Sequence, residues 1–171
     1  MQSMQQFDVI VVGAGPAGSS AALAMARAGL KVAFIERGEY AGAKNVSGAA
    51  LYAPDLLADL LPNYWEEAPL ERYLTRRVVT FLGKEAATSL DFRTNRFNKP
   101  PYNGFTILRP KFDRWLAGKA EEAGAILITS TVVDDLLYKH KQVIGVRAIR
   151  GGDDTGKGTA RRGASSNSPR D

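Results

Sequence analysis

The 171-residue sequence contains no cysteine and a single histidine, His140. Without cysteine the chain cannot supply a disulfide framework, a thiolate zinc site, a cysteine nucleophile or ligands to an iron–sulfur cluster. One histidine excludes a histidine-rich metal centre and gives little support to a histidine-dependent triad. No apolar run approaches the roughly 20 residues of a membrane-spanning helix, and residues 1–8 lack the basic segment of a signal peptide. These absences predict a cytoplasmic protein without a transmembrane segment.

Charge is moderate in both signs, with 23 Lys and Arg against 18 Asp and Glu and a formal net charge of +5. The basic residues are not gathered into one block. The balance therefore favours anionic ligands or acidic partners without singling out nucleic acid.

The composition changes at residue 150. Residues 1–150 carry regularly spaced apolar clusters, whereas residues 151–171 contain no Val, Ile, Leu, Met, Phe, Trp or Tyr. A segment that buries so little apolar surface cannot offset a backbone ordering entropy of roughly 1–2 kcal/mol per residue. We predict one folded domain over residues 1–150 and a disordered polar tail over residues 151–171.

The start of the chain has the pattern of a β-α-β unit. An apolar strand over residues 7–12 leads through a glycine-rich turn into a helix over residues 16–28, and a second strand covers residues 31–36. Both strands are short runs rich in Val, Ile and Phe, which is typical of a parallel sheet covered on both faces. A long loop is expected over residues 37–50.

The later elements are predicted from their apolar spacing. The helix that opens at Pro110 places four apolar residues on one face: Phe112, Trp115, Leu116 and Ala120. The other expected elements are a short helix over residues 54–61, a hairpin with arms 77–82 and 87–92, and strands over residues 105–108, 126–129, 132–137 and 143–150.

The glycine-rich turn is a G-x-G-x-x-G sequence formed by Gly13, Gly15 and Gly18. In this motif the first glycine permits a tight turn, the second lets the backbone approach a pyrophosphate, and the third allows close packing of helix on strand. Pro16 and Ala17 lie in the first turn of the helix, whose unpaired N–H groups and positive dipole end attract a diphosphate. The motif predicts a dinucleotide site.

Glu36 supports this interpretation, because it ends the second strand 18 residues after Gly18. A carboxylate there can accept hydrogen bonds from the ribose hydroxyls of an adenosine, and it disfavours a 2′-phosphate by charge repulsion. The alternative is a glycine turn of another α/β protein with a surface glutamate. The β-α-β unit alone leaves FAD and NAD(H) open.

Three segments outside the β-α-β unit resemble a known family. Residues 38–52 (GEYAGAKNVSGAALY) and 68–74 (APLERYL) are similar to Fix-type (FixC-like) flavoproteins and electron-transfer-flavoprotein:quinone oxidoreductases. Residues 109–125 (RPKFDRWLAGKAEEAGA) resemble the R-x-x-F-D-x-x-L helix of geranylgeranyl-reductase-like flavoenzymes. The predicted fold class is therefore α/β: a Rossmann-like FAD-binding domain with a parallel sheet, a β-hairpin insertion and a β-meander, and truncated.

The resemblance implies an FAD-dependent oxidoreductase of the Fix type. Such proteins accept electrons from an electron-transfer flavoprotein and pass them toward quinone or a ferredoxin-like partner, and full-length relatives are cytoplasmic or peripheral at the membrane. A different flavin-dependent reductase of the geranylgeranyl-reductase-like superfamily is an alternative. No catalytic acid or base is nominated, because the flavin itself performs the redox chemistry.

The resemblance also implies roles for individual residues of the cofactor site. The pyrophosphate would meet Gly13, Gly15, Pro16, Ala17, Gly18 and Arg109; the adenosine would meet Glu36, Arg37 and the backbone of Val133; the flavin side would meet Ser47, Gly48 and Ala49. Each has a simpler alternative: Ser47 and Gly48 as a flexible loop, Arg109 as a surface ion-pair partner, and Val133 as a core residue.

A basic and aromatic cluster lies between the predicted hairpin and the following strand. Its members are Phe92, Arg93, Arg96, Phe97, Lys99 and Tyr102. Such residues can stack on bases, but no nucleic-acid module accompanies them, so no nucleic acid is expected as a partner. Contact with an acidic electron-transfer partner is the better hypothesis.

The chain departs from the family after residue 150. Relatives are well over twice this length and continue into a further buried strand beside the first one. Without that strand we expect an exposed apolar edge, and a frameshift after codon 150 would explain the abrupt change. A nucleotide-binding fragment that cannot turn over is therefore the second functional hypothesis.

Overall fold

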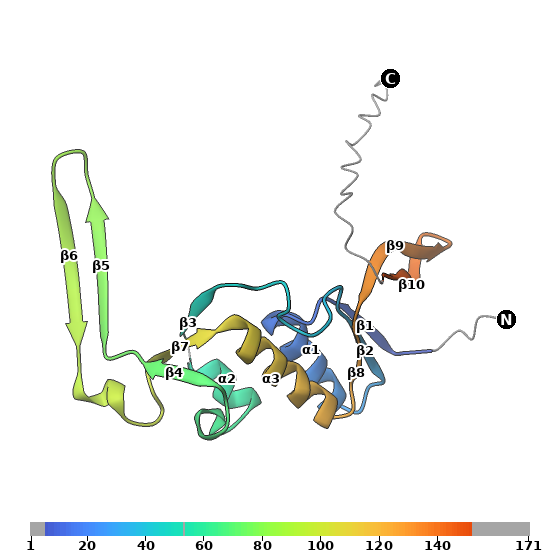
Figure 1. The fold of residues 1–171 in the computed structure, drawn as a ribbon, viewed down its shortest axis with the longest axis horizontal. Helices are drawn as coiled ribbons and strands as arrows, with labels where there is room; N and C mark the ends of the chain where they lie inside the picture. The colour runs from blue at the N-terminus through green and yellow to red at the C-terminus, as the bar shows by residue number, and fades with distance from the viewer. Residues whose placement is uncertain (1–5, 53, 152–171) are drawn as a thin grey trace.

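The computed structural model describes residues 6–52 and 54–151 (Figure 1). The predicted β-α-β unit is confirmed as β1 (Val9–Val12), α1 (Pro16–Arg27) and β2 (Val32–Ile35). β2 is the central strand of a parallel sheet with the order β1-β2-β8, in which β8 is Ile126–Ile128. Its four residues are all buried, as is typical of a parallel strand whose two faces are both covered.

β1 lies at one edge of this sheet within the described part of the chain. It pairs with β2 in register, with Val9 opposite Val32 and Val12 opposite Ile35. Its first three residues are half-buried and Val12 is 58% exposed. An apolar strand edge is therefore accessible in the described residues. Of the predicted tail, only Gly151 falls within them.

Helices α1 and α3 (Arg109–Glu122) lie side by side and cover the parallel sheet (Figure 1). The predicted apolar face of α3 is confirmed, since Phe112, Leu116 and Ala120 are at most 1% exposed and Trp115 packs partly buried against the same core. No helix in the described ranges is both long and apolar enough to cross a bilayer.

A second, antiparallel sheet has the order β3-β7-β4 and consists of β3 (Gly48–Tyr52), β7 (Gly104–Leu108) and β4 (Leu70–Tyr73). The expectation of a loop as far as residue 50 was wrong, and β4 was missed. Glycine, alanine and charged residues have low strand propensity. Both strands depend instead on pairing with β7, whose Phe105 and Ile107 are buried.

The remaining elements are short helices and two hairpins. α2 (Pro54–Leu60), η1 (Tyr64–Glu66) and η2 (Asn95–Asn98) connect the strands. Strands β9 (Thr131–Lys139) and β10 (Gln142–Arg150), which were predicted over residues 132–137 and 143–150, form an antiparallel hairpin. Their turn residues His140 and Lys141 have φ values of 49° and 67°. His140 is exposed.

The predicted hairpin insertion is β5 (Arg76–Leu82) paired with β6 (Ala87–Arg93), and it projects away from both sheets (Figure 1). Because side chains alternate along a strand, one face carries four exposed apolar residues: Val79, Phe81, Leu90 and Phe92. The opposite face carries the bidentate Arg76–Asp91 pair and the Thr80–Ser89 hydrogen bond.

Gly18→Ala should lower the free energy of unfolding by about 1–3 kcal/mol, a range typical of overpacking. A Cβ on Gly18 would lie 1.9 Å from the carbonyl oxygen of Gly13, so backbone must move. Gly118→Ala in α3 is the matched control: its Cβ would meet no atom within 4 Å, and stability should rise by about 0.5–1 kcal/mol. Urea denaturation measures both, and an unaltered Gly18→Ala chain would contradict the close packing.

Candidate functional site

The glycine-rich turn joins β1 to α1 at the edge where the parallel strands end. Gly13 has a φ of +96°, which favours glycine, and its N–H donates to the carbonyl oxygen of Ile35 at 2.7 Å. Gly18 lies so close to Gly13 that no side chain fits. Two of the three predicted glycine roles, the tight turn and the close helix packing, thus have a direct geometric basis.

Gly15 borders open space at the beginning of α1. A Cβ at this position would have only Arg109 Nη2 as a near neighbour, at 4.0 Å. Gly15 is also the N-cap residue, and no side chain caps this helix end. The N–H groups of the first turn are therefore available to an anion. Pro16 occupies the first helical position and Ala17 is exposed.

Glu36 braces the glycine turn. Its Oε2 accepts a hydrogen bond from the N–H of Ala14 at 2.9 Å, and its Oε1 accepts one from the N–H of Gly38 at 2.8 Å. A carboxylate offers about four acceptor positions, so acceptor capacity remains for the hydroxyls of a ribose. The predicted ribose contact stays a prediction, and bracing the turn is an additional role.

Arg109, at the start of α3, forms a bidentate ion pair with Asp113, from Nε to Oδ1 and from Nη2 to Oδ2, both at 2.8 Å. The hydrogen bonds that Arg109 donates to Asp113 raise the pKa of Arg109, so the guanidinium stays charged. The alternative of a surface ion pair fits only in part. Arg109 does form an ion pair and is 27% exposed, but its partner Asp113 has a fully buried side chain. The pair lies beside Gly15.

The Ser47–Ala49 segment is brought to the same region. The carbonyl oxygen of Ser47 accepts a hydrogen bond from the N–H of Arg109 at 3.2 Å. Gly48 and Ala49 then pair with Leu108 and Ile107 as the first residues of β3. From Gly48 onward the segment is therefore part of a sheet, and it lies next to the beginning of α3.

Backbone connections place Val133 and Arg37 near Glu36. The carbonyl oxygen of Glu36 accepts a hydrogen bond from Thr131 N–H at 3.0 Å, and Val133 follows two residues later in β9, half-buried and paired with Ala148. Arg37 directly follows Glu36 and is exposed. The core alternative for Val133 fits only in part, since the residue is not fully buried.

Sequence reasoning missed the polar residues that support this site. Asp113 and Asn45 are joined by a hydrogen bond of 2.8 Å from Asn45 Nδ2 to Asp113 Oδ2. The hydroxyl of the fully buried Ser19 donates to the carbonyl oxygen of Ala14 at 3.0 Å. For Asp113 the sequence does hold a signal, because its i, i+4 spacing from Arg109 is typical of an ion pair on a helix. Asn45 and Ser19 carry no comparable signal.

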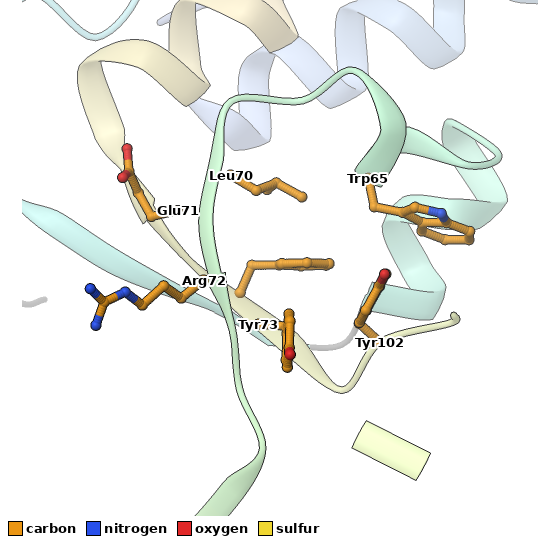
Figure 2. A pocket seen from close by; sticks show the side chains of 7 residues that line it. Trp65, Leu70, Glu71, Arg72, Tyr73 and Tyr102 are labelled. Atoms are coloured by element: carbon orange, nitrogen blue, oxygen red, sulfur yellow. The ribbon is translucent and has the colours of Figure 1, made fainter. Parts of the chain in front are cut away.

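An aromatic groove of about 380 Å³ lies apart from the glycine turn, between η1, β4 and β7 (Figure 2). Its rings pack on one another: Tyr73 stacks on Tyr102 with centroids 5.6 Å apart, and Tyr102 meets Phe105 at 5.0 Å. The groove is lined by Trp65, Leu70, Glu71, Arg72, Tyr73, Tyr102 and Phe105, none of them a predicted cofactor residue. The predicted basic and aromatic cluster is largely brought together: Phe92 packs on Phe97, and Arg96, Phe97 and Tyr102 line a further cavity.

The β-α-β unit, its glycine turn and the acidic residue after β2 together define a dinucleotide-binding protein of the Rossmann type. A sequence model of the FAD dependent oxidoreductase family matches residues 8–161. The chain belongs to this family, and FAD is the cofactor that its description names.

Curated relatives refine this assignment. The chain is 49% identical to Protein FixC of Azotobacter vinelandii over 148 residues, which are 86% of this chain and 34% of that protein. It is 48% identical over 152 residues to the probable electron transfer flavoprotein-quinone oxidoreductase YdiS of Escherichia coli (strain K12), covering 89% of this chain and 34% of that one. The chain therefore spans about a third of the length of these relatives.

Solved structures support the fold. A geranylgeranyl bacteriochlorophyll reductase-like protein from Thermoplasma acidophilum matches with a TM-score of 0.70 and 24% identity, over 88% of this chain and 36% of that one. The myxobacterial FAD-dependent halogenase CndH matches with a TM-score of 0.64 and 27% identity, over 83% of this chain and 32% of that one. The predicted Rossmann-like fold class and the resemblance to Fix-type flavoproteins are confirmed.

Tyr64→Phe should remove a pH dependence of stability. Tyr64 is fully buried behind the aromatic groove, and its Oη has no hydrogen-bond partner in the described ranges. Burial, and secondarily the charge of Asp55, raises the pKa of Tyr64 from 10.0 to about 12. As the pH rises, the unfolded chain therefore loses this proton before the folded chain does. The contribution of Tyr64 to the free energy of unfolding is intact below pH 10 and falls as the pH rises toward 12.

Urea denaturation at several pH values measures this effect. Between about pH 9 and pH 12 the free energy of unfolding of the wild-type chain should fall by about 2 kcal/mol more than that of Tyr64→Phe. Tyr138→Phe, at an exposed tyrosine, is the control and should follow the wild type. Parallel curves for wild type and Tyr64→Phe would contradict the raised pKa.

Proposed function

We propose that this chain is the FAD-binding part of a Fix-type flavoprotein oxidoreductase. One observation carries the proposal: the open end of α1 at Gly15 has the guanidinium of Arg109 on one side and the carboxylate of Glu36 on the turn itself. A cation at a helix N-terminus suits a diphosphate, and a carboxylate suits ribose hydroxyls. The residues present therefore fit an adenine dinucleotide.

The chain's own residues would bind and orient the cofactor. The first-turn N–H groups at Ala17 and Gly18 and the guanidinium of Arg109 would hold the diphosphate. Glu36 would hold the ribose, with Arg37 and the backbone of Val133 toward the adenine. FAD supplies the electron transfer when it is bound.

Ser47, Gly48 and Ala49 would face the flavin end of the cofactor. Ser47 and Gly48 are exposed and Ala49 is half-buried, and the hydrogen bond between Ser47 and Arg109 ties this segment to the diphosphate end. A segment anchored in β3 can hold a planar ring more firmly than a mobile loop can. This anchoring supports the assignment.

An electron-transfer flavoprotein is the proposed electron donor, and quinone or a ferredoxin-like protein is the proposed acceptor. Similarity to the probable electron transfer flavoprotein-quinone oxidoreductase YdiS supports the electron-transfer flavoprotein and the quinone. Net positive charge and exposed arginines on the β5–β6 hairpin favour an acidic protein surface. No nucleic acid is proposed, and peripheral membrane contact belongs to the quinone hypothesis.

A second candidate function is nucleotide binding without turnover. It is favoured because the site residues Gly15, Glu36 and Arg109 are groups that bind a dinucleotide, and none of them is nominated as a catalytic acid or base. The same site geometry serves both candidates. Only electron transfer distinguishes them.

FAD binding should be abolished or strongly weakened by Gly15→Ala without loss of stability. The new methyl group has room in the chain, because its nearest neighbour would be Arg109 Nη2 at 4.0 Å, but it would occupy the space that a diphosphate approaches. Titration calorimetry should show FAD binding to the wild type and at least tenfold weaker binding to Gly15→Ala. NAD should not displace FAD. Equal affinity of both chains would contradict the proposed site.

Quinone reduction tests the electron-transfer part. The FAD-loaded chain is mixed with reduced electron-transfer flavoprotein and a short-chain quinone, and the loss of quinone absorbance is followed. The proposal expects a rate that depends on added FAD and is absent with Gly15→Ala. FAD binding without any FAD-dependent rate would instead support nucleotide binding without turnover.

A further inference from the structure

We propose that Asp113 is a positioning residue that holds Arg109 toward the diphosphate of the bound dinucleotide, and that Asn45 holds Asp113 in turn. The inference rests on the proposed function, because it assigns a means of orientation to the same cofactor site.

Three hydrogen bonds from these two partners hold the carboxylate of Asp113. Oδ1 accepts from Arg109 Nε, and Oδ2 accepts from both Arg109 Nη2 and Asn45 Nδ2, with all three distances 2.8 Å. Asp113 is 0% exposed. A buried carboxylate is tolerated only when it is paired and hydrogen-bonded, so losing either partner is costly, and this cost keeps Arg109 and Asn45 in place.

Arg109 keeps free donors at the glycine turn. Its guanidinium has five N–H groups, and Asp113 uses one on Nε and one on Nη2. The same Nη2 lies 4.0 Å from the position of a Cβ on Gly15. The planar fork is therefore fixed on one side by a carboxylate, while the other side is available to the oxygens of a phosphate.

The loop over residues 37–47 also contacts Asp113. Besides the Asn45 contact, Gly42 approaches Asp113 so closely that a Cβ on Gly42 would lie 2.9 Å from Asp113 Cβ, and Gly42 has a φ of +89°. An i, i+4 ion pair on an exposed helix surface would require neither the Asn45 contact nor the Gly42 contact. Asp113 thus links α3, the diphosphate end of the site and the loop that leads to Ser47.

Orientation in advance increases affinity, because an arginine that is already fixed loses less freedom when it binds. An Arg109 released from Asp113 would remain charged but would sample many rotamers. The expected result of Asp113→Asn is therefore a loss of about tenfold in affinity for ligands that carry a diphosphate. Affinity for a ligand without phosphate should not change.

Titration calorimetry with FAD, ADP and adenosine tests this on the full chain. Asp113→Asn and Arg109→Met should both weaken FAD and ADP binding and leave adenosine unaltered. Arg109→Met/Asp113→Asn should bind ADP no more weakly than Arg109→Met alone, because Asp113 acts through Arg109. Glu122→Gln, which removes an exposed partner of Lys119 on the same helix, is the matched control and should bind all three ligands as the wild type does.

Three results would overturn the inference: wild-type ADP affinity in Asp113→Asn, an equal loss for adenosine, or additive losses in the double variant. If Asp113→Asn does not fold, as a thermal melt would show, Asn45→Ala replaces it, with a loss of about threefold for ADP and none in the Arg109→Met background. A wild-type chain that binds neither FAD nor ADP would overturn the proposed function itself, and is thereby distinguished from failure of this inference alone.

Discussion

The site depends on one carboxylate, that of Glu36. It accepts hydrogen bonds from the N–H of Ala14 in the glycine turn, 22 residues earlier in the sequence, and from the N–H of Gly38 in the following loop. The backbone of Glu36 is meanwhile held by Ile128 and Thr131. Four segments are therefore fixed relative to one another at the end of β2, and the space in front of α1 takes its shape from them.

A second carboxylate organises the opposite side of the turn. Asp113 is buried, whereas Glu36 is half-buried, and each binds backbone or side-chain donors from a loop that the sequence does not mark as regular structure. Between them they fix both ends of the loop over residues 37–47. A long connection between β2 and β3 thereby becomes part of the site without helix or strand of its own.

The β-α-β unit, the face of α3 and both hairpins were predictable, because each follows from local spacing of apolar residues and from glycine chemistry. The glycine turn and Glu36 were predictable for the same reason. β3 and β4 were not, since Gly48, Ala49 and Arg72 are strand residues only by virtue of their pairing with β7. The roles of Asp113 and Asn45 were not predictable either, because 68 residues separate them in the sequence and only the tertiary fold brings them together.

The β5–β6 hairpin should open more readily than the parallel sheet. Its fourteen strand residues are exposed on both faces, so the hairpin is ordered by its own backbone hydrogen bonds and by contacts at its base. An isolated pair of strands is only marginally stable in water. The strands of the parallel sheet open only when the core around Phe34 and Leu116 opens. Amide protons at the hairpin tip therefore exchange by local fraying, whereas those of β2 report global unfolding.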